Sequence, residues 1–243
     1  MAAALVTGVS RRRGIAAAVA ARLRTDGLTV VTAGWTPYDR EQHKAIAEQT
    51  QTDLQADLGV SDAPAELIRA AERVAGPLSS LVIAHTRDTG GGVLEMTAET
   101  IDQHLAINVR GSLLLMREFA RRVLEDGRTG RIVIFTSGPP QAGAVAYAAS
   151  KGALEWVVYS AATELGPLGI TVNGVNPGPN QTGWMSSELE RALAERTPLG
   201  RTGRPEDAAA LVSMLLSADA GFINGQVITS DGGFSIAGSS RPR

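Results

Sequence analysis

The chain has 243 residues, of which 44% are hydrophobic and 20% charged, and its formal net charge is −2 at pH 7. This composition is that of a globular protein, so it excludes fibrous and largely disordered architectures, and the weak net charge does not favour binding to nucleic acid or to an anionic membrane surface. There is no cysteine, which excludes disulfides and thiolate metal sites; the three histidines (His43, His85 and His104) lack metal-ligand spacing, so we predict no metal site.

Short apolar runs rich in Val and Ile alternate with longer segments in which apolar residues recur at helical spacing. The predicted strands are 3–6, 28–33, 81–84, 131–136, 170–175 and 227–229. The predicted helices are 15–25, 63–75, 98–125, 144–165 and 205–216. Such alternation predicts a doubly wound, Rossmann-type α/β sheet of about seven mostly parallel strands with helices on both faces.

No linker or internal repeat interrupts this pattern, so we expect a single domain over residues 1–237 and a disordered tail over 238–243. The N-terminus lacks a charged segment typical of signal peptides, and no apolar run reaches the ~20 residues of a membrane span. We therefore expect a cytoplasmic protein that has small-molecule ligands and does not bind nucleic acid or membranes.

The turn after the first predicted strand contains Gly8 and Gly14 and leads into an alanine-rich helix. Glycines at a strand-to-helix turn let the backbone approach a pyrophosphate, and the helix N-terminus presents free amides to it. Ligands in doubly wound folds lie beyond the carboxyl ends of the strands. This turn is therefore a candidate dinucleotide site.

Arg12 and Arg13 in this turn are candidates to bind a ribose 2′-phosphate, because a guanidinium pairs bidentately with phosphate. Chains that prefer NAD place a carboxylate after the second strand, whereas this sequence reads Thr-Ala-Gly-Trp-Thr over residues 32–36. The combination favours NADP(H) over the alternative, NAD(H), with Thr36 as a further contact.

Tyr147 and Lys151 are four residues apart in a predicted helix, so both side chains lie on one face. An adjacent ammonium favours the phenolate, so we expect Lys151 to lower the pKa of Tyr147 and make it a usable proton donor and acceptor. Ser137 follows the strand at 131–136, where its hydroxyl is placed to bind a substrate oxygen.

Asn108 interrupts an apolar helical stretch at residues 105–109. A buried amide needs partners. Asn108 is therefore either part of a local structural bond or the anchor of an ordered water.

Taken together and in this order, the motifs resemble the classical short-chain dehydrogenases/reductases over nearly the whole chain. The matching pieces are the glycine turn at residues 7–15, Asp57-Leu58, Asn108, Ser137, Tyr147 to Lys151, Asn176-Pro177-Gly178 with Thr182, the run 200–207, residues 225–227 and Asp231-Gly232-Gly233.

The resemblance implies roles for these residues. Tyr147 is the general acid or base, Lys151 lowers its pKa and holds the nicotinamide ribose, Ser137 orients the carbonyl, and Asn108 fixes a water in the proton relay. The cofactor contacts that it implies are Gly8, Ser10, Arg12, Arg13, Gly14, Ile15, Thr36, Asp57, Leu58, Asn108, Tyr147, Lys151, Pro177, Gly178 and Thr182, with Asp57 at the adenine and Thr182 at the carboxamide.

Three features depart from the family pattern. The glycine turn has one extra residue and ends in Ala16 in place of its last glycine. Residues 83–86 read Ile-Ala-His-Thr in place of Asn-Asn-Ala-Gly, which removes an asparagine that ties neighbouring strands; we interpret His85 as structural. The loop between Ser137 and Tyr147 is a few residues short.

The resemblance implies NADPH-dependent reduction of a carbonyl on an apolar or carrier-bound substrate, or the reverse oxidation, similar to 3-oxoacyl carrier-protein reductases and secondary-metabolite ketoreductases. Ser137, Trp184 and Met185 are the candidate substrate contacts, although Trp184 and Met185 are equally suited to packing against the body of the protein. The alternatives are a nucleotide-binding protein without turnover and a lyase-type relative such as a halohydrin dehalogenase. The resemblance also implies a homotetramer, with a homodimer as the alternative.

Overall fold

The structure is a computed structural model that describes residues 2–38, 51–138 and 142–237; the predicted tail at 238–243 lies outside these ranges. The described residues form one seven-stranded sheet in the order β3-β2-β1-β4-β5-β6-β7, and every pairing is parallel. The strands are β1 (Ala3–Thr7), β2 (Thr29–Gly34), β3 (Leu54–Gln55), β4 (Leu78–Ile83), β5 (Gly130–Phe135), β6 (Ile170–Asn176) and β7 (Val227–Thr229). The predicted fold class is confirmed.

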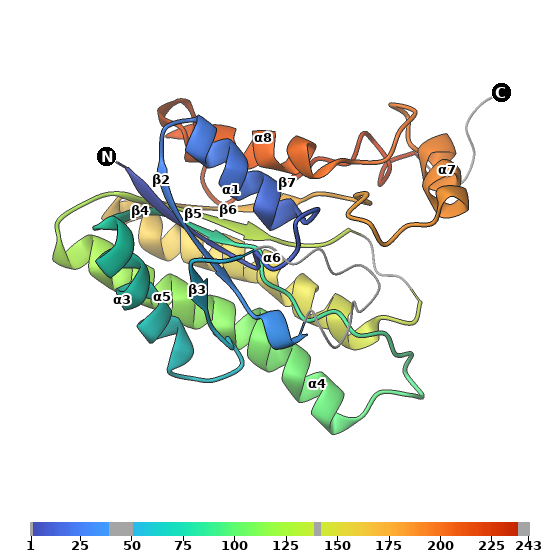
Figure 1. The fold of residues 1–243 in the computed structure, drawn as a ribbon, viewed down its shortest axis with the longest axis horizontal. Coiled ribbons are helices and arrows are strands. Elements are labelled where there is room, and N and C mark those ends of the chain that lie inside the picture. The colour runs from blue at the N-terminus through green and yellow to red at the C-terminus, as the bar shows by residue number, and fades with distance from the viewer. Residues whose placement is uncertain (1, 39–50, 139–141, 238–243) are drawn as a thin grey trace.

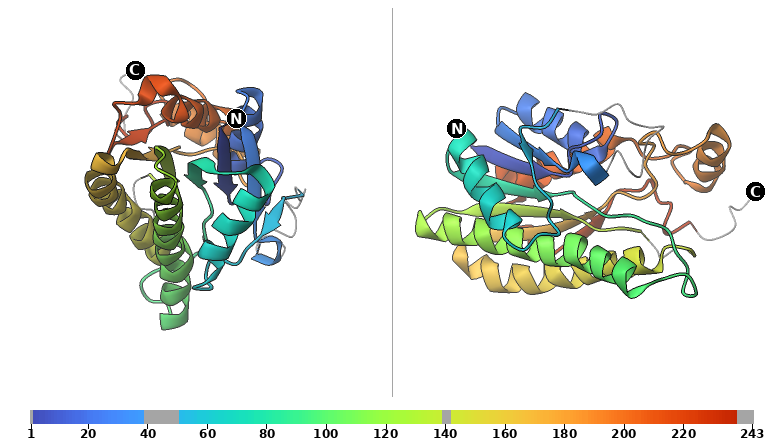
Figure 2. Two further views of the ribbon diagram at one scale, coloured as in Figure 1. Left: turned by 90° about the vertical axis from the view of Figure 1, so that its left-hand side faces the viewer. Right: turned by 60° about the horizontal axis from the view of Figure 1, so that its bottom comes forward.

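Helices cover both faces of the sheet (Figures 1 and 2). One layer contains α1 (Ile15–Thr25) and α8 (Pro205–Leu216), and the other contains α3 (Ala63–Ala75), α5 (Gly111–Glu125) and α6 (Val145–Leu165). All five residues of β1 are buried, which explains why its sequence is continuously small and apolar rather than alternating. No described helix has the length and apolar character needed to cross a membrane.

Several element boundaries differ from the sequence prediction by one residue, and two elements differ by more. The helix predicted at 98–125 is α4 (Ala98–His104) followed by a π-helical turn, η1 (Leu105–Arg110), and then α5. The fourth strand begins at Leu78 rather than at residue 81. The start of β4 was not predicted because it contains two polar residues, Ser79 and Ser80. Ser80 is buried, and the hydroxyl of Ser79 donates to the carbonyl of Ala3 at 3.1 Å. The hydrogen bond to the neighbouring strand lets the polar Ser79 enter the sheet.

The parallel pairing places the carboxyl ends of all strands at one edge, which lies toward α4 and α7 (Ser187–Arg196) in Figure 1. The connection from β3 to β4 crosses to the other side of β1, so the strand order reverses there. Such a switch point opens a crevice beyond the carboxyl ends of the strands, where doubly wound proteins bind ligands.

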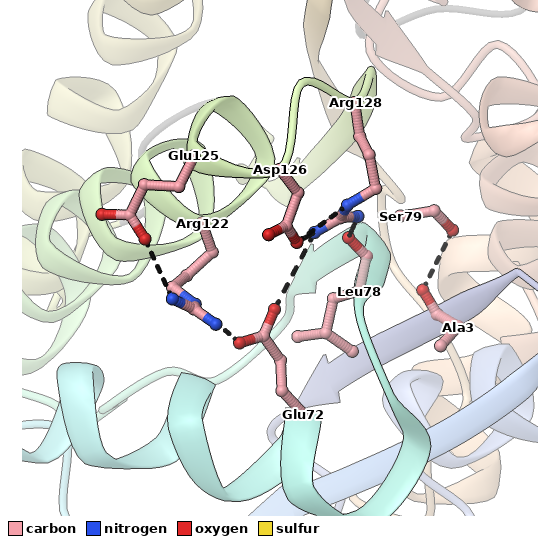
Figure 3. Close-up of polar contacts among 8 residues, drawn as sticks. All are labelled: Ala3, Glu72, Leu78, Ser79, Arg122, Glu125, Asp126 and Arg128. Carbon is pink, nitrogen blue, oxygen red and sulfur yellow. Dashed lines mark hydrogen bonds and ion pairs between the residues drawn. The ribbon is translucent and has the colours of Figure 1, made fainter.

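A carboxylate joins three elements at the opposite, amino-terminal edge of the sheet (Figure 3). Glu72 of α3 accepts from Arg122 Nε at 2.8 Å and lies 3.9 Å from Arg128, whose guanidinium also donates to the carbonyl of Leu78 at 2.6 Å. Glu125 and Asp126 complete the network from the exposed side. The Glu72 carboxylate is mostly buried, with 11% of its side chain exposed.

Replacing Glu72 with Ala should lower the free energy of unfolding by about 1–2 kcal/mol, between the values typical of exposed and of buried ion pairs. The measurement is urea unfolding at pH 7. Glu125→Ala is the matched control, because it removes an exposed member of the same network and should cost less than about 0.5 kcal/mol. Equal losses for the two variants would contradict a central role for Glu72.

Candidate active site

The glycine turn after β1 lies tightly against the end of β4. Gly8 has a φ of +79°, and a Cβ there would lie 2.6 Å from the carbonyl oxygen of Ala84 and 2.6 Å from the amide nitrogen of His85. Only glycine fits both the backbone conformation and the space. The turn is held further by Ser10, whose buried hydroxyl accepts from the amide of Trp35 at 3.3 Å. Ser10, a predicted cofactor contact, thus ties the turn to the end of β2.

The start of α1 has the properties of an anion site. Gly14 is its N-cap and supplies no side-chain acceptor, so the first-turn amides have no cap from that residue. Free amides and the positive end of the helix dipole favour a negative group there. The cradle at Gly8 and this uncapped helix start fit the pyrophosphate of a dinucleotide.

The end of β2 lies beside this turn, since a Cβ on Gly34 would be 2.7 Å from the carbonyl oxygen of Val9. Trp35 is 37% exposed and Thr36 is half-buried, and the Thr36 amide donates to Gln55 at 3.0 Å. Arg12 and Arg13 are exposed on the turn. A carboxylate near β2 does exist at Asp53, but it accepts the amide and the hydroxyl of Thr32 at 2.8 and 2.7 Å.

The segment after β3 carries Asp57 and Leu58 to the same edge of the sheet. Asp57 Oδ1 accepts the amide of Gly59 at 2.9 Å, which fixes the turn. Leu58 is buried, and a Cβ on Gly111 would lie 2.8 Å from its carbonyl oxygen. The close packing against the start of α5 holds this segment beside the crevice.

His85 replaces a missing asparagine as the tie between neighbouring elements. Its Nδ1 lies 3.0 Å from the hydroxyl of Thr7, and its Nε2 lies 3.1 Å from the carbonyl of Ile107. Burial lowers the pKa of His85 to about 4, against the opposing effect of the bond to Ile107; the charge of Lys151 lowers the pKa further. The neutral ring therefore donates from Nε2 and accepts at Nδ1, and the structural interpretation of His85 is confirmed.

Asn108 lies in η1 and is completely buried. Its Oδ1 accepts the amide of Arg87 at 2.6 Å, and its Nδ2 donates to the Arg87 carbonyl at 2.9 Å and to Ser150 Oγ at 2.8 Å. Ser150 Oγ in turn donates to the Tyr147 carbonyl at 2.7 Å. Both hydrogens of the Asn108 side-chain amide are thus donated to protein atoms, so the side chain forms the local structural bonds that were one of the two expectations. A water relay through Asn108 stays a prediction.

Tyr147 and Lys151 lie on one face of α6, with Nζ 5.9 Å from the centroid of the tyrosine ring. Ser137, which follows β5, makes a side-chain hydrogen bond with Tyr147. Lys151 is buried, and its ammonium donates to the carbonyl of Phe135 at 3.0 Å. The structure thus brings three of the four predicted catalytic side chains together at the end of β5, and Asn108 contacts this group only through Ser150.

The electrostatics of this group differ from the sequence prediction. Burial raises the pKa of Tyr147, the hydrogen bond from Ser137 opposes the shift, and the charges of Asp88 and Tyr38 add to it. Burial lowers the pKa of Lys151 to about 8, against the opposing effect of Asp88. The expected net lowering of the Tyr147 pKa is not found, because burial disfavours the phenolate by more than the bond from Ser137 favours it. A stabilisation of the phenolate by Lys151 stays a prediction.

The loop after β6 packs on the C-terminal turn. Gly178 has a φ of +62°, and a Cβ there would overlap the Cβ of Asp231. Pro177 is half-buried in the same turn, and Thr182 is buried with its amide bonded to the Asn180 carbonyl at 3.0 Å. Glycine at 178 therefore allows this loop, with Thr182, to return across the strand ends.

The two candidate substrate residues differ. The ring of Trp184 is exposed, and its Nε1 donates to the carbonyl of Asn180 at 3.0 Å. Met185 is buried, so it packs against the body of the protein instead of presenting its side chain to a substrate. Within the described ranges no group of three or more His, Cys, Asp or Glu side chains is arranged to hold a metal ion.

Sequence reasoning missed three residues near this site. Tyr38 follows β2, and Arg87 and Asp88 follow β4; their contacts connect segments about fifty residues apart. Neither segment has a motif that indicates the contact. Only the sheet order brings these two segments together.

Comparisons with known proteins agree over nearly the whole chain. A family model described as enoyl-(acyl carrier protein) reductase matches residues 8–235. An uncharacterized oxidoreductase, YjdA of Bacillus subtilis (strain 168), is 36% identical over 95% of this chain and 96% of its own. Versicolorin reductase 1 of Aspergillus parasiticus is 32% identical over 95% of each chain. A short-chain dehydrogenase/reductase from Serratia marcescens BCRC 10948 superposes with a TM-score of 0.82 at 33% identity, covering 96% of this chain and 98% of that chain.

The His85 tie predicts a specific loss of stability in acid. The pKa of His85 is about 4 in the folded chain, against 6.5 for an unperturbed histidine. Below pH 6.5 the unfolded chain binds the proton first, so the stabilisation is complete above pH 6.5 and is lost as the pH falls toward 4. Its slope is up to about 1.4 kcal/mol per pH unit.

Urea unfolding between pH 8 and pH 4.5 tests this prediction against the variant His85→Asn. The variant should be less stable at pH 8 but should lose less stability on acidification, since all other titrating groups are shared. Parallel pH dependences would show that His85 is not held neutral.

Proposed function

Because this chain belongs to the short-chain dehydrogenase/reductase family, we propose that it catalyses NADPH-dependent reduction of a carbonyl group to a secondary alcohol, with Tyr147 as the proton donor. Family membership implies an oxidoreductase that uses NAD(P)(H). The observation behind the choice of reaction and proton donor is the group of Ser137, Tyr147 and Lys151, which lies at the edge of the sheet that also holds the glycine turn.

The raised pKa of Tyr147 sets the protonation state in which it enters the proposed reaction. Burial keeps the phenol protonated at neutral pH, so it is a proton donor ready for a carbonyl oxygen. Ser137 is hydrogen-bonded to the same phenol, which supplies a second hydroxyl beside the oxygen that accepts the proton. The proposed reduction starts from this protonated form, and the reverse oxidation starts from the deprotonated form, which higher pH favours.

Lys151 acts on the charge that forms at Tyr147 after proton transfer. Its pKa of about 8 leaves most of it charged at pH 7, and its Nζ lies near the tyrosine ring. An ammonium close to a buried phenolate stabilises it. A bound nicotinamide supplies the hydride; the residues that would hold the dinucleotide are Gly8, Gly14, Ile15, Arg12, Arg13, Thr36, Asp57, Leu58, Lys151, Pro177, Gly178 and Thr182.

The alternatives have less support. A nucleotide-binding protein without turnover was suggested by the altered residues 83–86, but His85 restores a tie between β1 and η1. A lyase-type relative has no need of Lys151 beside Tyr147 or of the glycine cradle at Gly8. For the substrate we propose an apolar or carrier-bound carbonyl compound, with the exposed ring of Trp184 as the accessible apolar contact.

Homo-oligomerisation, as a tetramer or a dimer, is also part of this proposal. Leu113 of α5 and Trp156 and Tyr159 of α6 are large apolar or aromatic side chains that are exposed on the outer helices. Exposed patches of this kind are typical of protein–protein interfaces.

Replacing Tyr147 with Phe should lower kcat for carbonyl reduction by about 100-fold or more, because general acid catalysis contributes about 10²–10⁴-fold. NADPH affinity should stay within about threefold, since the ring is retained. The measurements are NADPH oxidation with a carbonyl library and fluorescence titration with NADPH. Tyr159→Phe on the same helix is the control and should be fully active. An active Tyr147→Phe enzyme would overturn the assignment of Tyr147.

Replacing Arg12 and Arg13 with Ala should weaken NADPH binding by about 10- to 100-fold, as expected for loss of charge-assisted bonds to a phosphate, and NADH binding much less. Fluorescence titration with both dinucleotides measures the difference. The double variant Arg69→Ala with Arg73→Ala removes equal charge from exposed positions on α3 and should change neither affinity. Equal losses for NADPH and NADH would show that Arg12 and Arg13 do not read the 2′-phosphate.

A further inference from the structure

A contact crosses the crevice between the segment after β2 and the loop after β4. Tyr38 of the first segment meets Arg87 and Asp88 of the second. β1 lies between β2 and β4 in the sheet, so a contact between the loops that follow these strands must pass over the carboxyl end of β1. The glycine turn, with the cradle at Gly8, begins there.

The contact uses both the hydroxyl and the ring of Tyr38. The amide of Asp88 donates to Tyr38 Oη at 2.8 Å, and the Tyr38 hydroxyl donates to the Asp88 carbonyl at 3.2 Å. The Arg87 guanidinium lies over the ring, 5.4 Å from its centroid. Arg87 Nε is buried and has no hydrogen-bond partner among the described residues, so stacking on Tyr38 is the interaction observed for this part of the side chain.

Bonds to other elements hold both sides of the contact in place. The loop after β4 is fixed at every second residue, by bonds of His85 to Ile107, Arg87 to Asn108, Thr89 to His104 and Gly91 to Gly143. On the other side, the Trp35 amide donates to Ser10 Oγ at 3.3 Å and the Thr36 amide donates to Gln55 at 3.0 Å.

The contact extends toward the catalytic group. Asp88 and Tyr38 both raise the pKa of Tyr147, and Asp88 also raises that of Lys151, so the charges of this contact act at the catalytic tyrosine. A dinucleotide that extends from the glycine turn to Tyr147 runs along the strand ends that this contact crosses.

We propose that Tyr38, Arg87 and Asp88 form a clasp across the dinucleotide crevice, which opens to let the cofactor enter and leave. The inference rests on the proposed function, because it takes a nicotinamide dinucleotide as the occupant. The hydroxyl bonds and the stacked ring keep the clasp closed, so breaking them accelerates exchange in both directions.

Stopped-flow fluorescence with NADPH tests the clasp on the full chain, by measuring association and dissociation rates for the wild type and three variants. Tyr38→Phe removes the hydroxyl and retains the ring, and Arg87→Met removes the stacked cation while the backbone bonds to Asn108 remain. Tyr159→Phe is the matched control. Both clasp variants should raise the association and dissociation rates by about 3- to 10-fold each, with the Kd within about threefold.

Each other result separates the possibilities. Unchanged rates in Tyr38→Phe and Arg87→Met, with normal NADPH binding, overturn the clasp and leave the proposed function standing. Faster dissociation with unchanged association means that Tyr38 or Arg87 contacts the cofactor directly, which also overturns a gate. Absence of NADPH and NADH binding in the wild type overturns the proposed function, and the clasp with it.

Discussion

Asn108 is the residue on which the geometry of the site depends most. One buried amide in η1 holds both backbone groups of Arg87 after β4 and, through Ser150, the backbone of Tyr147 in α6. A buried polar group left without a partner costs about 1–3 kcal/mol, so a displacement of any one element is penalised at all of these bonds. Tyr147 and the loop that carries Arg87 and Asp88 are therefore positioned together.

Burial sets the protonation states of Tyr147, Lys151 and His85. Burial favours the neutral form of each titrating group, so it raises the pKa of Tyr147 and lowers those of Lys151 and His85. The same cause thus keeps the Tyr147 phenol protonated, as the proposed role of proton donor requires, and keeps His85 in the neutral form that bridges Thr7 and Ile107. Asp88 works against the effect of burial at Lys151 and adds to it at Tyr147, so the β4 loop adjusts the pair from outside the helix.

Local sequence patterns determined much of the fold and the identity of the candidate residues. The apolar runs fall on the buried parallel strands. The segments 15–25, 63–75 and 205–216, predicted from helical periodicity, are helices in the structure with the same first and last residues. Spacing alone placed Tyr147 and Lys151 on one face of α6, and glycine at positions 8 and 178 is required where the backbone has positive φ and another chain segment lies against it. These features depend on a residue's own conformation or on neighbours within one turn or strand.

Tertiary structure decided what depends on residues far apart in the chain. The direction of the Tyr147 pKa shift depends on burial by several elements and not on the spacing to Lys151, and the role of His85 depends on Thr7 and Ile107, which are 78 and 22 positions away. The sequence pattern missed the start of β4 because Ser79 is polar, and its hydroxyl bonds to the neighbouring strand β1. The contact of Tyr38 with Asp88 exists only because β2 and β4 lie on either side of β1. The sequence alone thus determined which chemical groups the protein carries and in which elements, whereas their partners and charges were settled by the packing of the sheet, since polarity and hydrogen bonding in a buried site are properties of the assembled fold.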